Sequence, residues 1–99
     1  MRVQHTVVFR LRHERGSAEE AVFLADARRI LAAVPGVEDL AVQRQVSPQS
    51  PLTWQLAMSF ADEAAYAAYD AHPDHRAFVA ERWQTEVEAF QEYDFTAAD

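Results

Sequence analysis

The amino-acid sequence predicts a ferredoxin-like α+β fold, in which an antiparallel sheet carries helices on one face only. Apolar and polar residues alternate over residues 3–11 and 53–61, which is typical of half-buried strands. Apolar residues recur at helical spacing over residues 18–34 and again over 62–83. Taken in order, the elements give the arrangement β-α-β-β-α-β. With 49% hydrophobic residues, the chain is expected to form a single domain over residues 1–99.

The first half of the chain is predicted to form a strand, a helix and a second strand. The strand over residues 3–11 is followed by Ser17 and Glu20, whose spacing is that of a capping box at the start of a helix. The apolar periodicity predicts that this helix covers about residues 18–34. Residues 37–46 mix β-branched and polar residues, which indicates a strand at the edge of the sheet.

The second half repeats this pattern with one interruption. Residues 47–51, SPQSP, form a loop that leads into the strand over residues 53–61. Asp62 is expected to cap a second helix, which Pro73 interrupts. We expect Asp74 to restart the helix, which then continues through Trp83 and its neighbours. Residues 87–96 are predicted to form the last strand.

One face of the predicted sheet has no helices to cover it. The side chains expected there are a mixture of small polar and apolar ones, including Thr6, Val8, Ala57 and Ser59. This mixture is too apolar for a fully solvated surface and too polar for a hydrophobic core. The sequence therefore predicts a homodimer that buries two such faces against each other.

Composition excludes several classes of function. Nine Lys and Arg residues against sixteen Asp and Glu give a net charge of −7, which disfavours nucleic acid and anionic membranes as partners. The chain has no cysteine, no glycine-rich nucleotide motif and no P-loop, so we expect no cofactor. Arg2, Arg10 and Arg12 interrupt the apolar N-terminal stretch, which argues against a signal peptide or a membrane span. A cytoplasmic location is the expectation.

Four segments carry a resemblance to a known family. They are HTVVFRL in the first strand, PGV after the first helix, YDAHPDHRAFV around Pro73, and EYDF near the C-terminus. In this order they resemble the stress-responsive A/B barrel (Dabb) family over nearly the whole chain. The HPxH element, followed by a hydrophobic residue, is the most specific of the four.

The resemblance implies a dimeric α/β barrel, in which two ferredoxin-like sheets pair face to face with the helices outside. The family's clearest enzyme is a plant polyketide cyclase. In that kind of member, histidines at the positions of His5 and His75 carry out acid-base catalysis of an intramolecular aldol closure. The resemblance therefore implies a small polyketide or aromatic ligand for this chain.

The residues themselves leave two interpretations of His5. It lies on the apolar face of the first strand, which points at the helices. A neutral imidazole there can accept a proton through one nitrogen while a hydrogen bond fixes the other. The alternative is a core histidine whose hydrogen bond goes to a backbone carbonyl.

The helix break at Pro73 leaves two interpretations of His75. Pro73 removes a helical donor and displaces the backbone, which would open room for His75 to face His5 across a pocket. Alternatively, Pro73 only shapes the connection, and His72 and His75 cap helix ends at the surface. A metal site at the two histidines is disfavoured because the proline breaks the helical face that they would share.

Further residues were considered for the pocket. Tyr69 lies three residues before His72, and we expect Tyr69 and His72 to contact a substrate. Tyr66, one helical turn earlier, is a competing candidate. For either tyrosine the alternative is that its ring only fills the core. Trp54, Phe60, Phe78 and Trp83 are expected in the core or the pocket wall. Outside the pocket, His13 is expected to be a solvated loop residue. A solvated helix face is expected at Glu19, Glu20, Arg28 and Arg29. Arg10 is expected to pair with Glu88, Glu92 or Asp94.

Three functions follow as hypotheses. The first is a cofactor-independent cyclase or lyase-like enzyme that acts on a polyketide or aromatic compound through His5 and His75. The second is a non-catalytic, stress-associated or partner-binding dimer. The third is a haem or oxygen-using monooxygenase like other members of the wider dimeric-barrel group, which rests on fold alone. An enzyme should keep a cavity of several hundred cubic ångströms between sheet and helices, whereas a structural protein should fill it.

Overall fold

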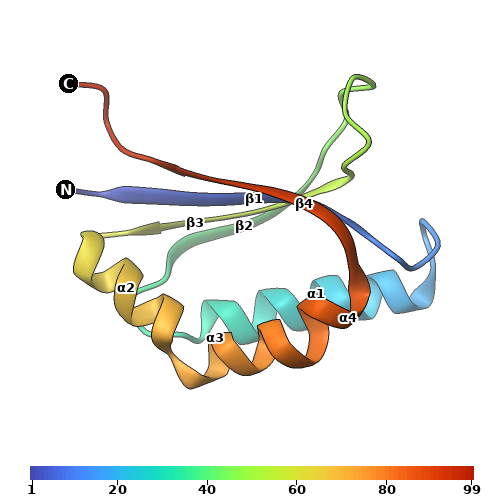
Figure 1. The fold of residues 1–99 in the computed structure, drawn as a ribbon, viewed down its shortest axis with the longest axis horizontal. Coiled ribbons are helices and arrows are strands. Elements are labelled where there is room, and N and C mark those ends of the chain that lie inside the picture. The colour runs from blue at the N-terminus through green and yellow to red at the C-terminus, as the bar shows by residue number, and fades with distance from the viewer.

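The computed structural model describes all 99 residues and has a four-stranded antiparallel sheet with all helices on one face (Figure 1). The strand order is β2-β3-β1-β4, so β1 is central and β2 lies at an edge, as the sequence predicts. β1 pairs with both β3 and β4. The ferredoxin-like fold is therefore confirmed. The strands are β1 (Val3–Leu11), β2 (Glu38–Arg44), β3 (Trp54–Phe60) and β4 (Val87–Phe95).

The helices form one long element and one interrupted element that lie side by side (Figure 1). The chain breaks between α2 and α3, as Pro73 predicts, and then stays helical up to β4. The middle of this second segment, η1, has π-helical hydrogen bonding, which widens the turn. The helices are α1 (Ala18–Ala32), α2 (Glu63–Ala71), α3 (Pro73–Phe78), η1 (Val79–Trp83) and α4 (Gln84–Glu86). None of them is long and apolar enough to cross a membrane.

The start of α1 differs from the prediction in one respect. Ser17 Oγ accepts a hydrogen bond from the Glu20 amide at 3.2 Å, which confirms the N-cap. The Glu20 carboxylate, however, is only 6% exposed. It accepts hydrogen bonds from the amide of Gly16 and from the indole of Trp54, both at 3.0 Å. The expectation that Glu20 belongs to a solvated face was wrong, because α1 packs its first turn against β3.

A charged network ties α1 to the end of the second helical segment. Arg82 donates to Asp26 at 2.6 Å and also to Glu86, which in turn lies 2.6 Å from His13 Nε2. The hydrogen bond from Arg82 lowers the pKa of Asp26. Burial raises the pKa of Glu86, but the bonds from Arg82 and His13 outweigh it, so the net shift is downward. The expectation of a solvated His13 was therefore wrong.

The hydrophobic core fills part of the space between the sheet and the helices. Its largest fully buried side chains come from both layers: Phe9, Phe23, Val34, Leu56, Met58 and Phe60. No helix covers the opposite face of the sheet (Figure 1). On that face Tyr93 and Phe95 remain half exposed, with their rings stacked at 6.0 Å. Arg10 pairs with Glu88 at 2.7 Å, one of the three predicted partners.

Candidate active site

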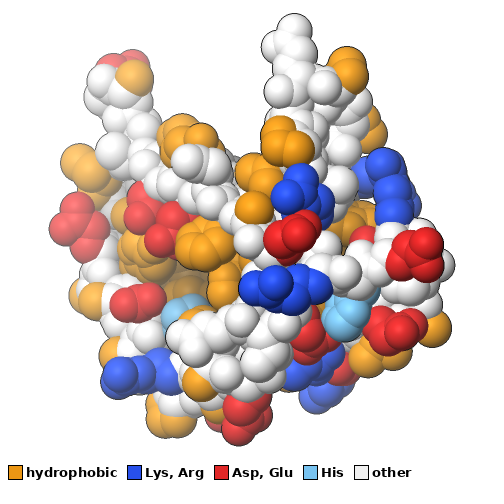
Figure 2. Space-filling model, turned by 45° about the vertical axis from the view of Figure 1, so that its right-hand side comes forward, with side chains coloured by type: hydrophobic (Ala, Val, Ile, Leu, Met, Phe, Trp, Pro, Cys, Tyr) orange, Lys and Arg blue, Asp and Glu red, His pale blue; other side chains and the backbone are white.

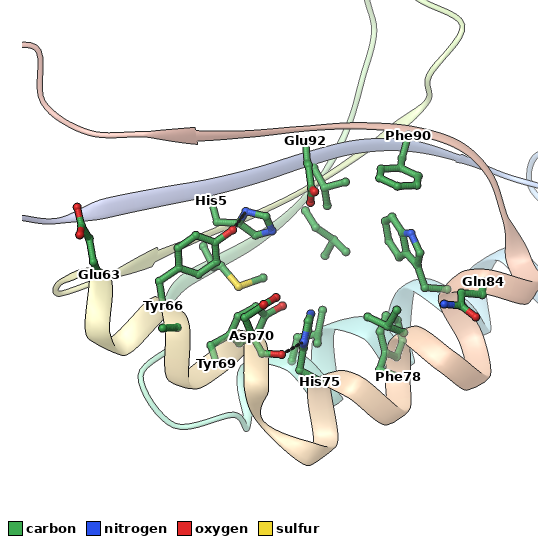
Figure 3. A pocket seen from close by; sticks show the side chains of 17 residues that line it. His5, Glu63, Tyr66, Tyr69, Asp70, His75, Phe78, Gln84, Phe90 and Glu92 are labelled. Carbon is green, nitrogen blue, oxygen red and sulfur yellow. Dashed lines mark hydrogen bonds between the residues drawn. The ribbon is translucent and has the colours of Figure 1, made fainter.

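A cavity of about 710 Å³ lies between the sheet and the second helical segment, a volume typical of small-molecule sites (Figure 3). Figure 2 shows a hollow with hydrophobic side chains inside it and Asp and Glu side chains among those at its edge. Of the 17 residues that line the cavity, 11 are hydrophobic. The polar ones are His5, Glu63, Asp70, His75, Gln84 and Glu92. The cavity thus combines an apolar interior with a few titratable groups.

The helix break rearranges the backbone hydrogen bonds around His75. In a continuous helix the carbonyl of Asp70 would accept from the amide of Asp74. Here the Asp74 amide donates to Nδ1 of His72 at 3.1 Å, and the Asp70 carbonyl lies 3.0 Å from Nδ1 of His75. Pro73 sits at the first position of α3, where its missing N–H costs nothing. The break therefore frees a carbonyl that holds the imidazole of His75.

This contact assigns the tautomer of His75 when the ring is neutral. A backbone carbonyl can only accept, so Nδ1 of His75 carries the proton and Nε2 carries a free lone pair. The ring lies against Tyr69, with centroids 4.4 Å apart, and projects from α3 into the cavity (Figure 3). His75 is thus placed as a hydrogen-bond acceptor, or base, toward a bound ligand.

His72 takes a different role from the predicted substrate contact. Its Nδ1 caps the amide of Asp74, and its backbone is extended, as expected for a residue before proline. The helix, expected to restart at Asp74, begins one residue earlier at Pro73, and the Asp74 amide donates to this cap. His72 does not line the cavity. His72 acts on the site indirectly. It accepts a hydrogen bond from the Asp74 amide, which in a continuous helix would donate to the Asp70 carbonyl, and this carbonyl is then free to accept from His75.

His5 belongs to a three-residue cluster at the other end of the cavity. It is 8% exposed, and its Nδ1 lies 2.6 Å from Oδ1 of Asp94, its cross-strand neighbour on β4. The hydroxyl of Tyr66 lies 2.9 Å from the same nitrogen and donates to Oδ2 of Asp94 at 3.1 Å. The expected alternative, a backbone carbonyl as the partner of His5, was wrong. With Nδ1 engaged by Asp94, Nε2 is the nitrogen left for a ligand.

Two tyrosines connect the histidines. The ring of Tyr69 lies 6.5 Å from that of His5 as well as against His75. Burial raises the pKa of Tyr69, and the charges of Asp70 and Glu92 add to this effect. Burial likewise raises the pKa of Tyr66, followed by its hydrogen bond to Asp94. Both phenols therefore stay protonated at neutral pH and can act as hydrogen-bond donors.

The inner wall of the cavity is aromatic. Trp83, on the π-helical turn, packs on Phe9 with ring centroids 5.0 Å apart and edge-on against Phe90 at 5.6 Å. Phe90 is 51% exposed and lines the cavity from β4. Trp83 was expected in the core or the pocket wall, and it belongs to both. Phe90 was not among the expected wall residues, because its place opposite Phe9 depends on the register of β1 and β4.

The structure places no group of three His, Asp or Glu side chains where they could hold a metal ion. His72 and His75 direct their Nδ1 atoms to different backbone groups, an amide and a carbonyl. What the cavity offers is two imidazoles, two phenols and an apolar wall. This set is suited to binding a carbonyl compound and moving a proton, since imidazole is the commonest general acid-base group.

These features define the class of the protein: a ferredoxin-like domain with histidines facing a cavity between its sheet and helices. The chain belongs to the Stress Responsive A/B Barrel Domain (Dabb) family, whose pattern matches residues 3–97. It is similar to a Dabb family protein of ferredoxin-like fold from Mesorhizobium loti, at 47% sequence identity and a TM-score of 0.98. The alignment covers 99% of this chain and 98% of that one. No curated protein sequence matched.

More distant structures share the fold. A hydroxynitrile lyase from Passiflora edulis has a TM-score of 0.84 at 14% identity, with 99% of this chain and 94% of that chain aligned. A dimeric ferredoxin-like protein of unknown function from Thermobifida fusca has a TM-score of 0.77 at 19% identity, with 98% and 92% aligned. At these identities the likeness establishes the fold and leaves activity open.

Proposed function

We propose that this protein is a cofactor-independent enzyme that acts by proton transfer on a small polyketide-like or aromatic carbonyl compound. The observation that carries the proposal is that His5 and His75 line one ligand-sized cavity, each with its Nδ1 hydrogen-bonded away from the ligand. Each imidazole therefore presents Nε2 as its reactive atom. A packed interior, which the non-catalytic alternative predicts, would leave no such cavity.

In the proposed reaction His75 is the base. Its Nε2 takes a carbon-bound proton that flanking carbonyl groups have made acidic, and the ring becomes an imidazolium whose Nδ1–H still donates to the Asp70 carbonyl. The electron pair moves to the carbonyl oxygen. Tyr69 stabilises that oxygen by donating its phenolic hydrogen, since the phenol stays protonated. The carbanion can then attack a second carbonyl carbon in the same molecule.

His5 completes the proton balance. In its protonated form it donates through Nε2 to the oxygen of the attacked carbonyl, while Nδ1–H donates to the Asp94 carboxylate. His75 returns its proton to the medium and His5 regains one, so an aldol closure needs no external acceptor of electrons. The solved structures of this fold include a hydroxynitrile lyase, which at 14% identity shares the fold alone.

The proposal includes a homodimer formed through the helix-free face of the sheet. Tyr93 and Phe95 are half exposed there, at 49% and 51%. Large aromatic side chains on an uncovered sheet face are typical of a protein interface. The T. fusca protein of the same fold is described as dimeric, which supports the same assembly. A cytoplasmic location stays a prediction from the sequence.

Two alternatives remain distinct. A non-catalytic dimer accounts for the uncovered face but not for an aromatic-walled cavity with two oriented imidazoles. An oxygenase shares the fold, but no residue of this cavity favours oxygen chemistry over proton transfer.

Exchange of carbon-bound hydrogen for deuterium tests the proposal without knowledge of the product. Ethyl benzoylacetate, an aryl β-keto ester, is incubated with the protein in D₂O, and loss of its α-proton signal is followed by NMR against buffer alone. We expect wild-type protein to accelerate exchange and His75→Ala to lose about 100-fold or more of that acceleration. His13→Gln, a histidine change outside the cavity, is the control and should retain it.

Two results would overturn the proposal. Exchange at the buffer rate with wild-type protein would remove the proton-transfer step. Acceleration that survives in both His75→Ala and His5→Ala would show that the protein acts through other groups. Circular dichroism of each variant establishes that the fold is intact before its rate is compared.

A further inference from the structure

The cavity carries three carboxylates that have no role in the proposed proton transfer. Glu63 and Asp70 project from α2 and Glu92 from β4, and all three line the cavity (Figure 3). None of their side chains makes a hydrogen bond or ion pair with another side chain, in contrast to Asp94, which is engaged by His5 and Tyr66. Three solvent-exposed negative groups thus line one cavity without a cationic partner.

No positive side chain offsets them from within the lining. The 17 lining residues include two histidines but no arginine. Arg76 follows His75 directly in sequence, yet it is exposed and lies outside the lining. The negative field also acts on the phenols, since Asp70 and Glu92 contribute, after burial, to the raised pKa of Tyr69. A ligand that carries a carboxylate or phosphate group would be repelled in this cavity.

The remaining walls suit a ligand cation. Aromatic faces attract positive charge because of their quadrupoles, and Tyr69, Trp83 and Phe90 all line the cavity. The apolar lining would bind the hydrocarbon part of the same ligand. Aromatic rings next to uncompensated carboxylates provide both interactions that recognise a protonated amine on an aromatic or aliphatic body.

The proposed proton transfer also favours a positively charged substrate. Removal of a carbon-bound proton puts negative charge on the substrate, and three carboxylates nearby would oppose that charge. A positive group on the substrate itself would pair with the carboxylates and keep the net charge of the site low as the carbanion forms. A neutral substrate, such as ethyl benzoylacetate, lacks this compensation and should react more slowly, and an anionic one should also bind weakly.

We propose that the substrate of this cavity is an organic cation: a carbonyl compound that carries a protonated amine and an aromatic or apolar body. The carboxylates of Asp70 and Glu92, whose charges both act on the Tyr69 phenol, bind the ammonium group, and the aromatic wall binds the body. The inference rests on the proposed function, because it names the substrate class of the same cavity.

Binding of three matched probes tests the inference without turnover. The probes are 2-phenylethylamine, 2-phenylethanol and 3-phenylpropionate, which share a phenyl ring and differ in charge at neutral pH. Dissociation constants are measured by calorimetry or by the fluorescence of Trp83, which lines the cavity. We expect the amine to bind at least tenfold more tightly than the acid, with the alcohol between them. Added salt should weaken the preference strongly, because Glu63, Asp70 and Glu92 are all exposed to solvent.

Charge-neutralising variants identify the groups responsible. The double variant Asp70→Asn/Glu92→Gln should lose most of the preference for the amine. A matched control, Glu19→Gln/Glu81→Gln, removes the same charge from exposed sites outside the cavity and should keep it.

Equal binding of amine and acid, no binding of any probe, or a preference that survives in the cavity double variant would each overturn the inference. The proposed function fails by a different result, namely deuterium exchange that does not depend on His75. His75→Ala is therefore expected to keep the amine preference while losing the exchange activity.

Discussion

Replacing Glu20 by alanine is expected to destabilise the fold by about 2 kcal/mol more than replacing its neighbour Glu19. Glu20 is 6% exposed and accepts from the Trp54 indole at 3.0 Å, so its removal leaves a buried donor without a partner. A stranded buried donor costs about 1–3 kcal/mol. The bond from Gly16 adds little, because that amide is exposed and water can replace the carboxylate.

Glu19 is the matched control for this comparison. Both residues lie in the first turn of α1, so each contributes a similar interaction with the helix dipole, about 0.3–1 kcal/mol. The difference between the two variants therefore isolates the buried hydrogen bond. For a chain of this length, about 2 kcal/mol corresponds to a difference of roughly 10 °C in the midpoint of thermal unfolding.

The assay is thermal and urea unfolding followed by circular dichroism, with all variants at one protein concentration because a dimer's stability depends on it. Trp54→Phe, which strands the carboxylate instead of the indole, should show a comparable loss. Equal stabilities of Glu19→Ala and Glu20→Ala would show that the buried hydrogen bond contributes nothing measurable.

Two further predictions concern pH and assembly. The pKa values of Asp26 and Glu86 lie below their ordinary 3.8 and 4.5, so the stability that they contribute is complete above about pH 4.5 and is lost as the pH falls through their lower folded values. Arg82→Met should therefore flatten the loss of stability between pH 6 and pH 3 in urea unfolding, and an unchanged pH profile would contradict the network. The double variant Tyr93→Ser/Phe95→Ser should shift the protein from dimer to monomer in analytical ultracentrifugation, with the cavity unaffected. A dimer that withstands both changes would place the interface elsewhere.

The fold was largely predictable because each element has a local signal. Alternation identified β1 and β3, the Ser17 cap identified the start of α1, and Pro73 identified the break between the helices. Boundaries shifted by a few residues at most. The strand predicted over residues 37–46, for example, is confined to Glu38–Arg44.

The partners of the site residues were not predictable to the same extent. Asp94 was considered only as a partner of Arg10, because its pairing with His5 depends on the register of β1 and β4. That register shifts at a bulge between Arg10 and Leu11, which no local pattern reveals. Burial of Glu20 likewise depends on how α1 lies over β3. Sequence periodicity assigns a residue to a face, but the residue opposite it comes from tertiary packing.

The hydrogen-bond partners of His72 and His75 were likewise not predictable from the sequence, although the two residues are only three apart. The HPxH element predicted a helix break with a histidine on each side of Pro73. In the structure His72 lies between α2 and α3, and His75 lies in the first turn of α3. Which ring would enter the cavity and which would cap a helix was not decided by the sequence. The hydrogen bonds decide it, because His72 accepts from an amide whereas His75 donates to a carbonyl.

These opposite roles make the imidazole tautomers the most direct test of the account. Long-range ¹H–¹⁵N correlation spectra, recorded near pH 8 where imidazoles are mostly neutral, distinguish protonated from unprotonated ring nitrogens. We expect His75 to carry its proton on Nδ1, with Nε2 free toward the cavity, and His72 to carry its proton on Nε2. A proton on Nε2 of His75 would overturn its assignment as the base, because that atom would then be a donor, and the helix break would not serve the site.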